Sequence, residues 1–171
     1  MIDKDKLKNF EKLPADIRRQ FSLLANQYGE KKKTAGIQNN FMDFVKHVWP
    51  DFIEGKHHKQ IADKFDRLAQ GKIKRLIINM PPRHTKSEFG SYLLPAWMVG
   101  RNPKLKIIQS TNTTELSVRF GRKAKSLMDS PEYKQVFKTR LNPDSQAAGK
   151  WETEQGGEYY AAGVGSAITG R

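Results

Sequence analysis

The sequence predicts an α/β fold in which a central, mostly parallel β-sheet is flanked by helices, with a helical arm before it. Two short apolar runs, at 75–79 and 104–109, have the character of buried strands. Each is followed by apolar residues at helical spacing, at 87–99 and 113–128. Strands that alternate with helices in this way are typical of parallel sheets.

The sequence of the N-terminal region predicts a helical segment followed by a linker. Apolar residues at three- or four-residue steps predict helix over 2–28, and Pro14 suits the first turn of a second helix within that range. The stretch GEKKKTAG at 29–36 predicts an exposed linker. We therefore expect an arm over residues 1–35 and a main domain over residues 36–171.

The remaining elements follow in the same way. Amphipathic patterns predict helices at 38–48 and 57–70, and Pro131 opens a short helix that ends near Phe137. Toward the end of the chain, 151–153 and 158–161 predict a hairpin that turns at Gly156-Gly157.

Composition excludes several classes of protein. The 171 residues contain no Cys, so there is no disulfide framework, thiolate zinc site or cysteine nucleophile. No apolar run approaches the about 20 residues of a membrane span, and the charged start shows no export signal. We therefore expect an intracellular protein without a membrane segment. The net charge of +13 predicts a surface that attracts polyanions.

The basic charge is concentrated around one motif. Residues 71–110 hold eight basic residues against Glu88 alone, a net charge of +7. Within them, NMPPRHTKSE at 79–88 lies between a predicted strand and a predicted helix. A Lys-Ser pair there is what a phosphate-binding loop needs, because Lys86 reaches the β- and γ-phosphates and Ser87 ligates Mg²⁺.

The match to the phosphate-loop pattern G-x-x-x-x-G-K-[ST] is incomplete. Met80 stands at its first glycine and Thr85 at its second. From these residues alone two interpretations stay open. One is a phosphate-binding loop, and the other is a helix whose N-terminus carries Lys and Ser without a ligand.

An ordered set of longer motifs carries a resemblance. The segments are FMDFVKHVWPDF, HHKQIA, KRLIINMPPRHTKSE, LLPAWMVGRNPKLKII, SPEYKQVF, W-E-T followed by GGEYYAAG, and GVGSAITGR. From about Phe41 to Arg171 the chain resembles the N-terminal ATPase domain of the large terminase subunit of tailed double-stranded DNA bacteriophages. Many members of that family have Gly where this chain has Thr85.

The resemblance implies a RecA-like P-loop ATPase that uses ATP and Mg²⁺ to move double-stranded DNA into a procapsid. It implies the portal protein, the small terminase subunit and further copies in a homo-oligomeric ring as partners. The location would be the cytoplasm of an infected bacterial host, with transient docking on the portal and no secretion. Family members also carry a C-terminal nuclease domain.

Carried onto this sequence, the family's site residues fall mainly in the loop. Lys86 matches the phosphate-binding lysine, Ser87 the Mg²⁺ ligand, and Arg83 the arginine that contacts the γ-phosphate in cis. The ATP-binding residues implied are Pro82, Arg83, His84, Thr85, Lys86 and Ser87, with His57, His58 and Gln60 near the adenine. Arg171 matches an arginine finger that acts on the neighbouring subunit. Metal binding by His57 and His58 is not expected, because adjacent helical residues point in different directions.

In the family, the strand with the second Mg²⁺ ligand and the water-activating Glu follows the position of Arg171. We therefore expect an incomplete ATPase domain whose chain alone is inactive or very slow. Two alternatives remain, a catalytically silent nucleic-acid-binding chain and a P-loop NTPase or helicase outside packaging. The DNA-binding candidates are Lys72, Lys74, Arg101, Lys104, Lys106, Arg122 and Lys123.

Overall fold

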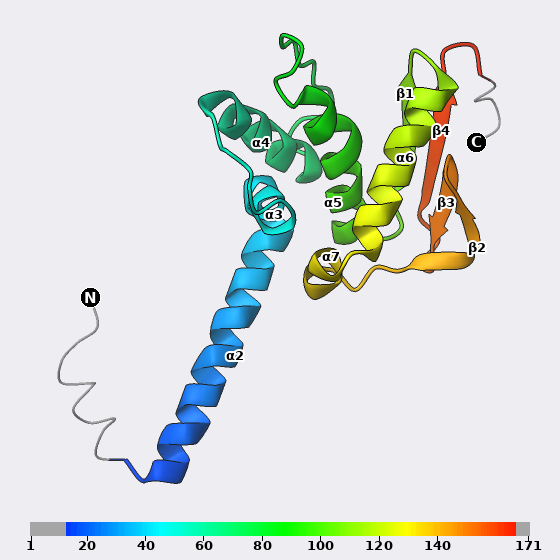
Figure 1. Cartoon of the computed structure of the whole chain (residues 1–171). Helices are drawn as coiled ribbons and strands as arrows, with labels where there is room; N and C mark the ends of the chain where they lie inside the picture. The colour runs from blue at the N-terminus through cyan, green and yellow to red at the C-terminus, as the bar shows by residue number, and fades with distance from the viewer. Residues whose placement is uncertain (1–12, 167–171) are drawn as a thin grey trace. The chain divides into compact units, whose positions relative to one another are not determined.

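The computed structural model describes residues 13–166, and the chain divides into two compact units, residues 1–35 and 36–171 (Figure 1). Helix α2 (Ala15–Asn39) begins directly after Pro14, as predicted, and includes every residue of the first unit from Ala15 onward. The predicted linker at 29–36 is wrong, because α2 continues through it. Glu and Lys favour the helix, and here they outweigh two glycines, Gly29 and Gly36. The predicted helix over 2–12 lies outside the described residues.

Two further helices open the second unit and confirm the predictions at 38–48 and 57–70. They are α3 (Phe41–Val48) and α4 (Lys56–Ala69). The side chain of Asn40 accepts the Asp43 N–H at 2.9 Å and begins α3. Asp66 on α4 accepts the Phe41 N–H at 2.7 Å, which joins the two helices.

The predicted strand at 75–79 is wrong. The chain is extended there, but within residues 13–166 it pairs with no strand. Burial still alternates as on a strand: Leu76, Ile78 and Met80 pack partly against the core, whereas Ile77 is 86% exposed. The segment therefore has the side-chain pattern of a strand without a neighbour to bond.

The helix predicted at 87–99 is confirmed. Helical structure begins at Lys86 and continues through a π-helical segment, η1 (Glu88–Leu93), into α5 (Leu94–Arg101). Such π-helical turns are rare and are frequent at functional sites.

The α/β class is confirmed, but the sheet is mixed rather than mostly parallel. Its order is β1 (Lys106–Thr111), β4 (Glu158–Gly163), β3 (Lys150–Thr153) and β2 (Leu141–Ala147). Among the strand pairs within residues 13–166, β1–β4 alone is parallel. The predicted hairpin is the antiparallel pair β3–β4, with Trp151 opposite Tyr159. Strand β2 was not predicted, and its pairing with β3 is irregular between Leu141 and Gln146.

Helix α6 (Thr114–Asp129) packs against β1 and β4, and the short α7 (Pro131–Val136) follows it. Both confirm the helices predicted there. In the helical core, the Phe41 ring meets Phe65 edge-on at 5.0 Å, and Phe89 and Trp97 at 5.4 Å between centroids. Phe89 lies one turn into the helix that begins at Lys86, so this core fixes the start of that helix. Throughout residues 13–166, each helix is too short or too polar to form a membrane span.

Candidate functional site

The candidate site is the loop formed by residues 80–88, called loop 80–88 below, between the extended segment and the helix that follows. The Phe89 N–H donates to the Thr85 carbonyl at 2.9 Å and closes the first helical turn. Lys86 and Ser87 therefore occupy the first positions of a helix. Its free N–H groups and the positive end of its dipole lie at the loop.

Two loop residues have left-handed backbone conformations. The φ angle is +64° at Arg83 and +57° at Thr85. Glycine adopts this region without cost, whereas a β-branched residue there is an outlier. Thr85 thus has a glycine-like backbone at the position where the phosphate-loop pattern has its second glycine.

Loop 80–88 surrounds a hollow of about 590 Å³, and among the residues that the structure describes its lining consists of residues 80–88. Arg83, His84 and Lys86 give it a basic character, and all three side chains are exposed. The Lys86 ammonium points back over the loop, with Nζ 3.4 Å from the Met80 carbonyl oxygen. This is a long, weak contact that a stronger acceptor in the hollow would replace.

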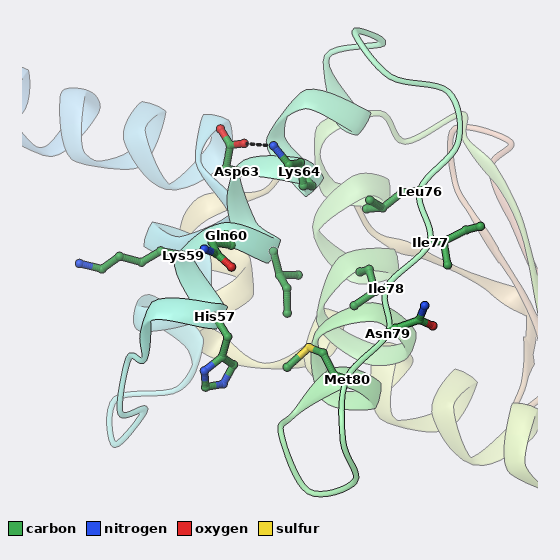
Figure 2. Close-up of a pocket in the computed structure, with 11 residues that line it drawn as sticks. His57, Lys59, Gln60, Asp63, Lys64, Leu76, Ile77, Ile78, Asn79 and Met80 are labelled. Atoms are coloured by element: carbon green, nitrogen blue, oxygen red, sulfur yellow. Dashed lines mark hydrogen bonds and ion pairs between the residues drawn. The ribbon is translucent and has the colours of Figure 1, made fainter.

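A second cavity, of about 810 Å³, lies beside the first between α4 and the extended segment (Figure 2). Figure 2 shows Leu76, Ile78 and Met80 pointing toward α4, whereas Ile77 and Asn79 point away from it. The α4 wall of this cavity consists of His57, Lys59, Gln60, Ile61, Asp63 and Lys64. Met80 lines both cavities, so they adjoin at this residue.

His58 joins α4 to loop 80–88. Its ring accepts the Gly55 N–H through Nδ1 at 2.9 Å, and Nε2 lies 2.7 Å from Thr85 Oγ1. The side chain is buried, at 6% exposure. Burial lowers the pKa of His58 below its ordinary value, with a further contribution from the charges of His57 and His84, while Glu54 opposes the shift.

A charged contact holds the start of the helix from the other side. Lys123 on α6 binds both carboxylate oxygens of Glu88, at 2.8 and 3.0 Å, and lies over the Tyr92 ring at 5.3 Å. The Glu88 carboxylate is therefore engaged next to Ser87, which does not suit a role as a free base.

Neither the sequence nor the structure of the chain matches a protein-family model, a curated protein or a solved structure.

The structure brings most of the predicted ATP-binding residues to two adjoining cavities. Pro82, Arg83, His84, Thr85, Lys86 and Ser87 line the first, and His57 and Gln60 line the second. His58 lines neither of them, because its ring is buried and both ring nitrogens already have partners. Arg171 lies outside the described residues.

The DNA-binding candidates fall into two groups. Lys72, Lys74, Lys104, Lys106 and Arg122 are exposed. The other two have partners inside the protein: Lys123 pairs with Glu88, and the Arg101 guanidinium lies 4.7 Å from the centre of the Trp97 ring. Among residues 13–166, no three His, Cys, Asp or Glu side chains gather as a metal site.

Two contacts of the site were not predicted from the sequence, the His58–Thr85 hydrogen bond and the Lys123–Glu88 pair. Their partners lie 27 and 35 residues apart. The sequence contained one signal for the Lys123–Glu88 pair, because Lys123 lies on the apolar side of a predicted helix that must cover a sheet.

Proposed function

We propose that the chain binds ATP with Mg²⁺ at loop 80–88 and is the ATPase part of a viral terminase, a motor that moves double-stranded DNA into a procapsid. One observation carries the nucleotide site: the left-handed Thr85 stands directly before Lys86 and Ser87 at the start of a helix. Successive backbone N–H groups in right- and left-handed conformations form the anion-binding concavity of a P-loop, and glycine is the residue that adopts the left-handed conformation most readily. The terminase assignment rests on the sequence motifs.

The triphosphate would occupy the hollow inside loop 80–88. The first helical N–H groups and the dipole favour an anion there. The Lys86 ammonium would leave the Met80 carbonyl for the β- and γ-phosphates. The Arg83 guanidinium, exposed on the same loop, would stabilise the negative charge that spreads over the transferred phosphoryl group.

The donor set of the loop fits Mg²⁺. The Ser87 side chain is exposed at the start of the helix and offers one hard oxygen ligand. Mg²⁺ retains water and takes further oxygens from the substrate phosphates, so Ser87 would supply one protein ligand and the triphosphate the next. When bound, the ion would neutralise charge on the β- and γ-phosphates.

The adenine would enter the second cavity. Its walls combine apolar surface from Ile78 and Met80 with the polar side chains of His57 and Gln60. A base can stack on an imidazole or a thioether, and an amide can bond the edge of the base. Since Met80 lines both cavities, a nucleotide could extend from one into the other.

The exposed basic residues support a second role in binding duplex DNA. Counterion release drives such binding without regard to sequence. This surface also suits the alternative function, a nucleic-acid-binding chain without catalysis. The portal protein, the small terminase subunit and a ring of identical subunits belong to the terminase proposal, as does a trans-acting role for Arg171.

Titration calorimetry with ATP and Mg²⁺ tests the nucleotide site. We expect Lys86→Ala to weaken binding about tenfold or more, since hydrogen bonds to charged groups contribute about 1.5–3 kcal/mol. Lys138→Ala is the matched control, because Lys138 is exposed and lines neither cavity. Equal affinities for Lys86→Ala and wild type would overturn the assignment. Salt-sensitive DNA binding without any ATP binding would favour the alternative function.

A further inference from the structure

A chain of three hydrogen bonds runs from the start of α4 into loop 80–88. It passes from Gly55 to His58, from His58 to Thr85 Oγ1, and from Thr85 Oγ1 to the His84 carbonyl, with lengths of 2.9, 2.7 and 2.7 Å. We call these three bonds the latch.

The partners fix the direction of every bond in the latch. A backbone N–H can only donate, so Nδ1 of His58 must be the unprotonated acceptor of the Gly55 N–H. The neutral ring then carries its proton on Nε2 and donates it to Thr85 Oγ1. The Thr85 hydroxyl is left to donate to the His84 carbonyl. A protonated His58 would place a second donor against Gly55, so the latch requires the neutral ring.

The latch ends at the strained residue of the loop. Thr85 combines a β-branched side chain with a φ of +57°. Its hydroxyl has a protein partner on each side, which favours this conformation over the extended ones that Thr prefers. Lys86 and Ser87 follow Thr85 directly in the sequence, so the backbone conformation of Thr85 determines where both residues lie.

Packing holds the His58 end of the latch in place. The ring lies against Phe52 at 4.8 Å and Phe89 at 5.1 Å between centroids. Phe89 is itself fully buried, and its N–H binds the Thr85 carbonyl. The loop is thus bound through Thr85 to α4 by a side chain and to the following helix by the backbone.

We infer that His58 is a positioning residue, which holds loop 80–88 in its phosphate-accepting conformation through the Thr85 hydroxyl. The expected effect of the latch on nucleotide affinity rests on the proposed function. It adds that a non-glycine residue at position 85 depends on a partner from α4, so positions 58 and 85 act as one unit.

Five variants, four single and one double, test the latch by ATP–Mg²⁺ affinity. Thr85→Val keeps the shape and the backbone strain of Thr but lacks the hydroxyl. His58→Phe keeps an aromatic ring that can pack in the same place but cannot form the hydrogen bonds. Each should weaken ATP binding about fivefold, the effect of one net hydrogen bond. Thr85→Ser keeps the hydroxyl and should bind like wild type. In a Thr85→Gly background, His58→Phe should have no further effect, because glycine needs no latch.

A second readout does not require nucleotide. Trypsin can cut after Arg83 and after Lys86, both exposed on the loop, and Lys72 provides a reference bond outside it. Thr85→Val and His58→Phe should speed cleavage in the loop several-fold relative to Lys72, whereas Thr85→Ser should not. Nitrogen NMR shifts of the His58 ring should show a neutral, Nε2-protonated tautomer in the wild type.

The outcomes separate the two ideas. If ATP binds and depends on Lys86, but Thr85→Val and His58→Phe match the wild type in affinity and cleavage, the latch is refuted and the proposed function stands. If loop cleavage follows the expected pattern but ATP does not bind, the latch stands and the proposed function fails. A His58 ring protonated on Nδ1 would also refute the latch. Thr85→Val replaces a half-buried residue, so it keeps the test decisive even if His58→Phe does not fold.

Discussion

Replacing Thr85 by Gly and by Ala separates the backbone requirement of this position from its hydrogen bonds. Both variants lose the hydroxyl and leave the buried Nε2 donor of His58 without its partner, which costs about 1–3 kcal/mol. The two differ in what the φ of +57° costs them and in the chain entropy that they lose on folding.

The magnitude follows from two opposing contributions. Ala in the left-handed region costs about 1–2 kcal/mol, a cost that Gly does not have. Gly loses more chain entropy on folding, by about 0.5–1 kcal/mol relative to Ala. Thr85→Gly should therefore be more stable than Thr85→Ala by about 0.5–1 kcal/mol. For a chain of this size, each kcal/mol of added stability raises the midpoint of thermal unfolding by about 2–4 °C.

Urea denaturation followed by tryptophan fluorescence measures the difference, since two of the three Trp residues, Trp97 and Trp151, are fully buried. Ser126, exposed within α6, provides the matched control. There the order should reverse, with Ala more stable than Gly by about 1 kcal/mol. An Ala variant at position 85 as stable as the Gly variant would refute the left-handed conformation, and with it the observation that carries the nucleotide site.

Three further predictions concern the surroundings of the loop. Burial holds the pKa of His58 below the ordinary 6.5, and the latch needs the neutral ring. The latch is therefore fully formed above pH 6.5 and is lost as the pH falls through the lowered pKa. As the pH falls through this pKa, ATP affinity should fall more in the wild type than in Thr85→Gly, and calorimetry at several pH values measures the difference. Lys123→Gln should lower the free energy of unfolding by no more than about 1 kcal/mol, since Lys123 and Glu88 are both over a third exposed. Thermal denaturation measures this, and a larger loss would indicate that Lys123 does more than pair with Glu88. Lys104→Ala should weaken duplex DNA binding equally for all sequences and reduce the salt slope by about one, and an unchanged slope would remove Lys104 from the DNA surface.

Local patterns predicted the helices of the second unit because their signals are local. Asn40 caps α3, apolar spacing marks α4 and α6, and Pro131 opens α7. The same local signals failed in α2, where a glycine and a run of lysines at 29–33 resembled a linker. Lysine is also a good helix former, and the sequence does not show which property dominates.

Strands were harder to predict, because a strand is defined by its neighbour. The run at 75–79 has the inward and outward alternation of a strand, yet within residues 13–166 no other strand lies beside it to bond. Conversely, β2 contains Pro143 and Asp144, residues that disfavour strands, and it forms by pairing with β3. Neither outcome can be derived from one segment alone.

The loop shows the same limit at the level of one residue. By the phosphate-loop pattern, Thr85 is a departure, and the pattern alone could not show whether the loop keeps its shape. The structure keeps the glycine-like φ and gives the hydroxyl two partners, one of them His58 on a different helix. What the pattern encodes is a backbone conformation, and glycine is one way to obtain it. Where a side chain occupies the position, its polar group needs a partner, so an unusual residue in a motif is best interpreted together with what it contacts.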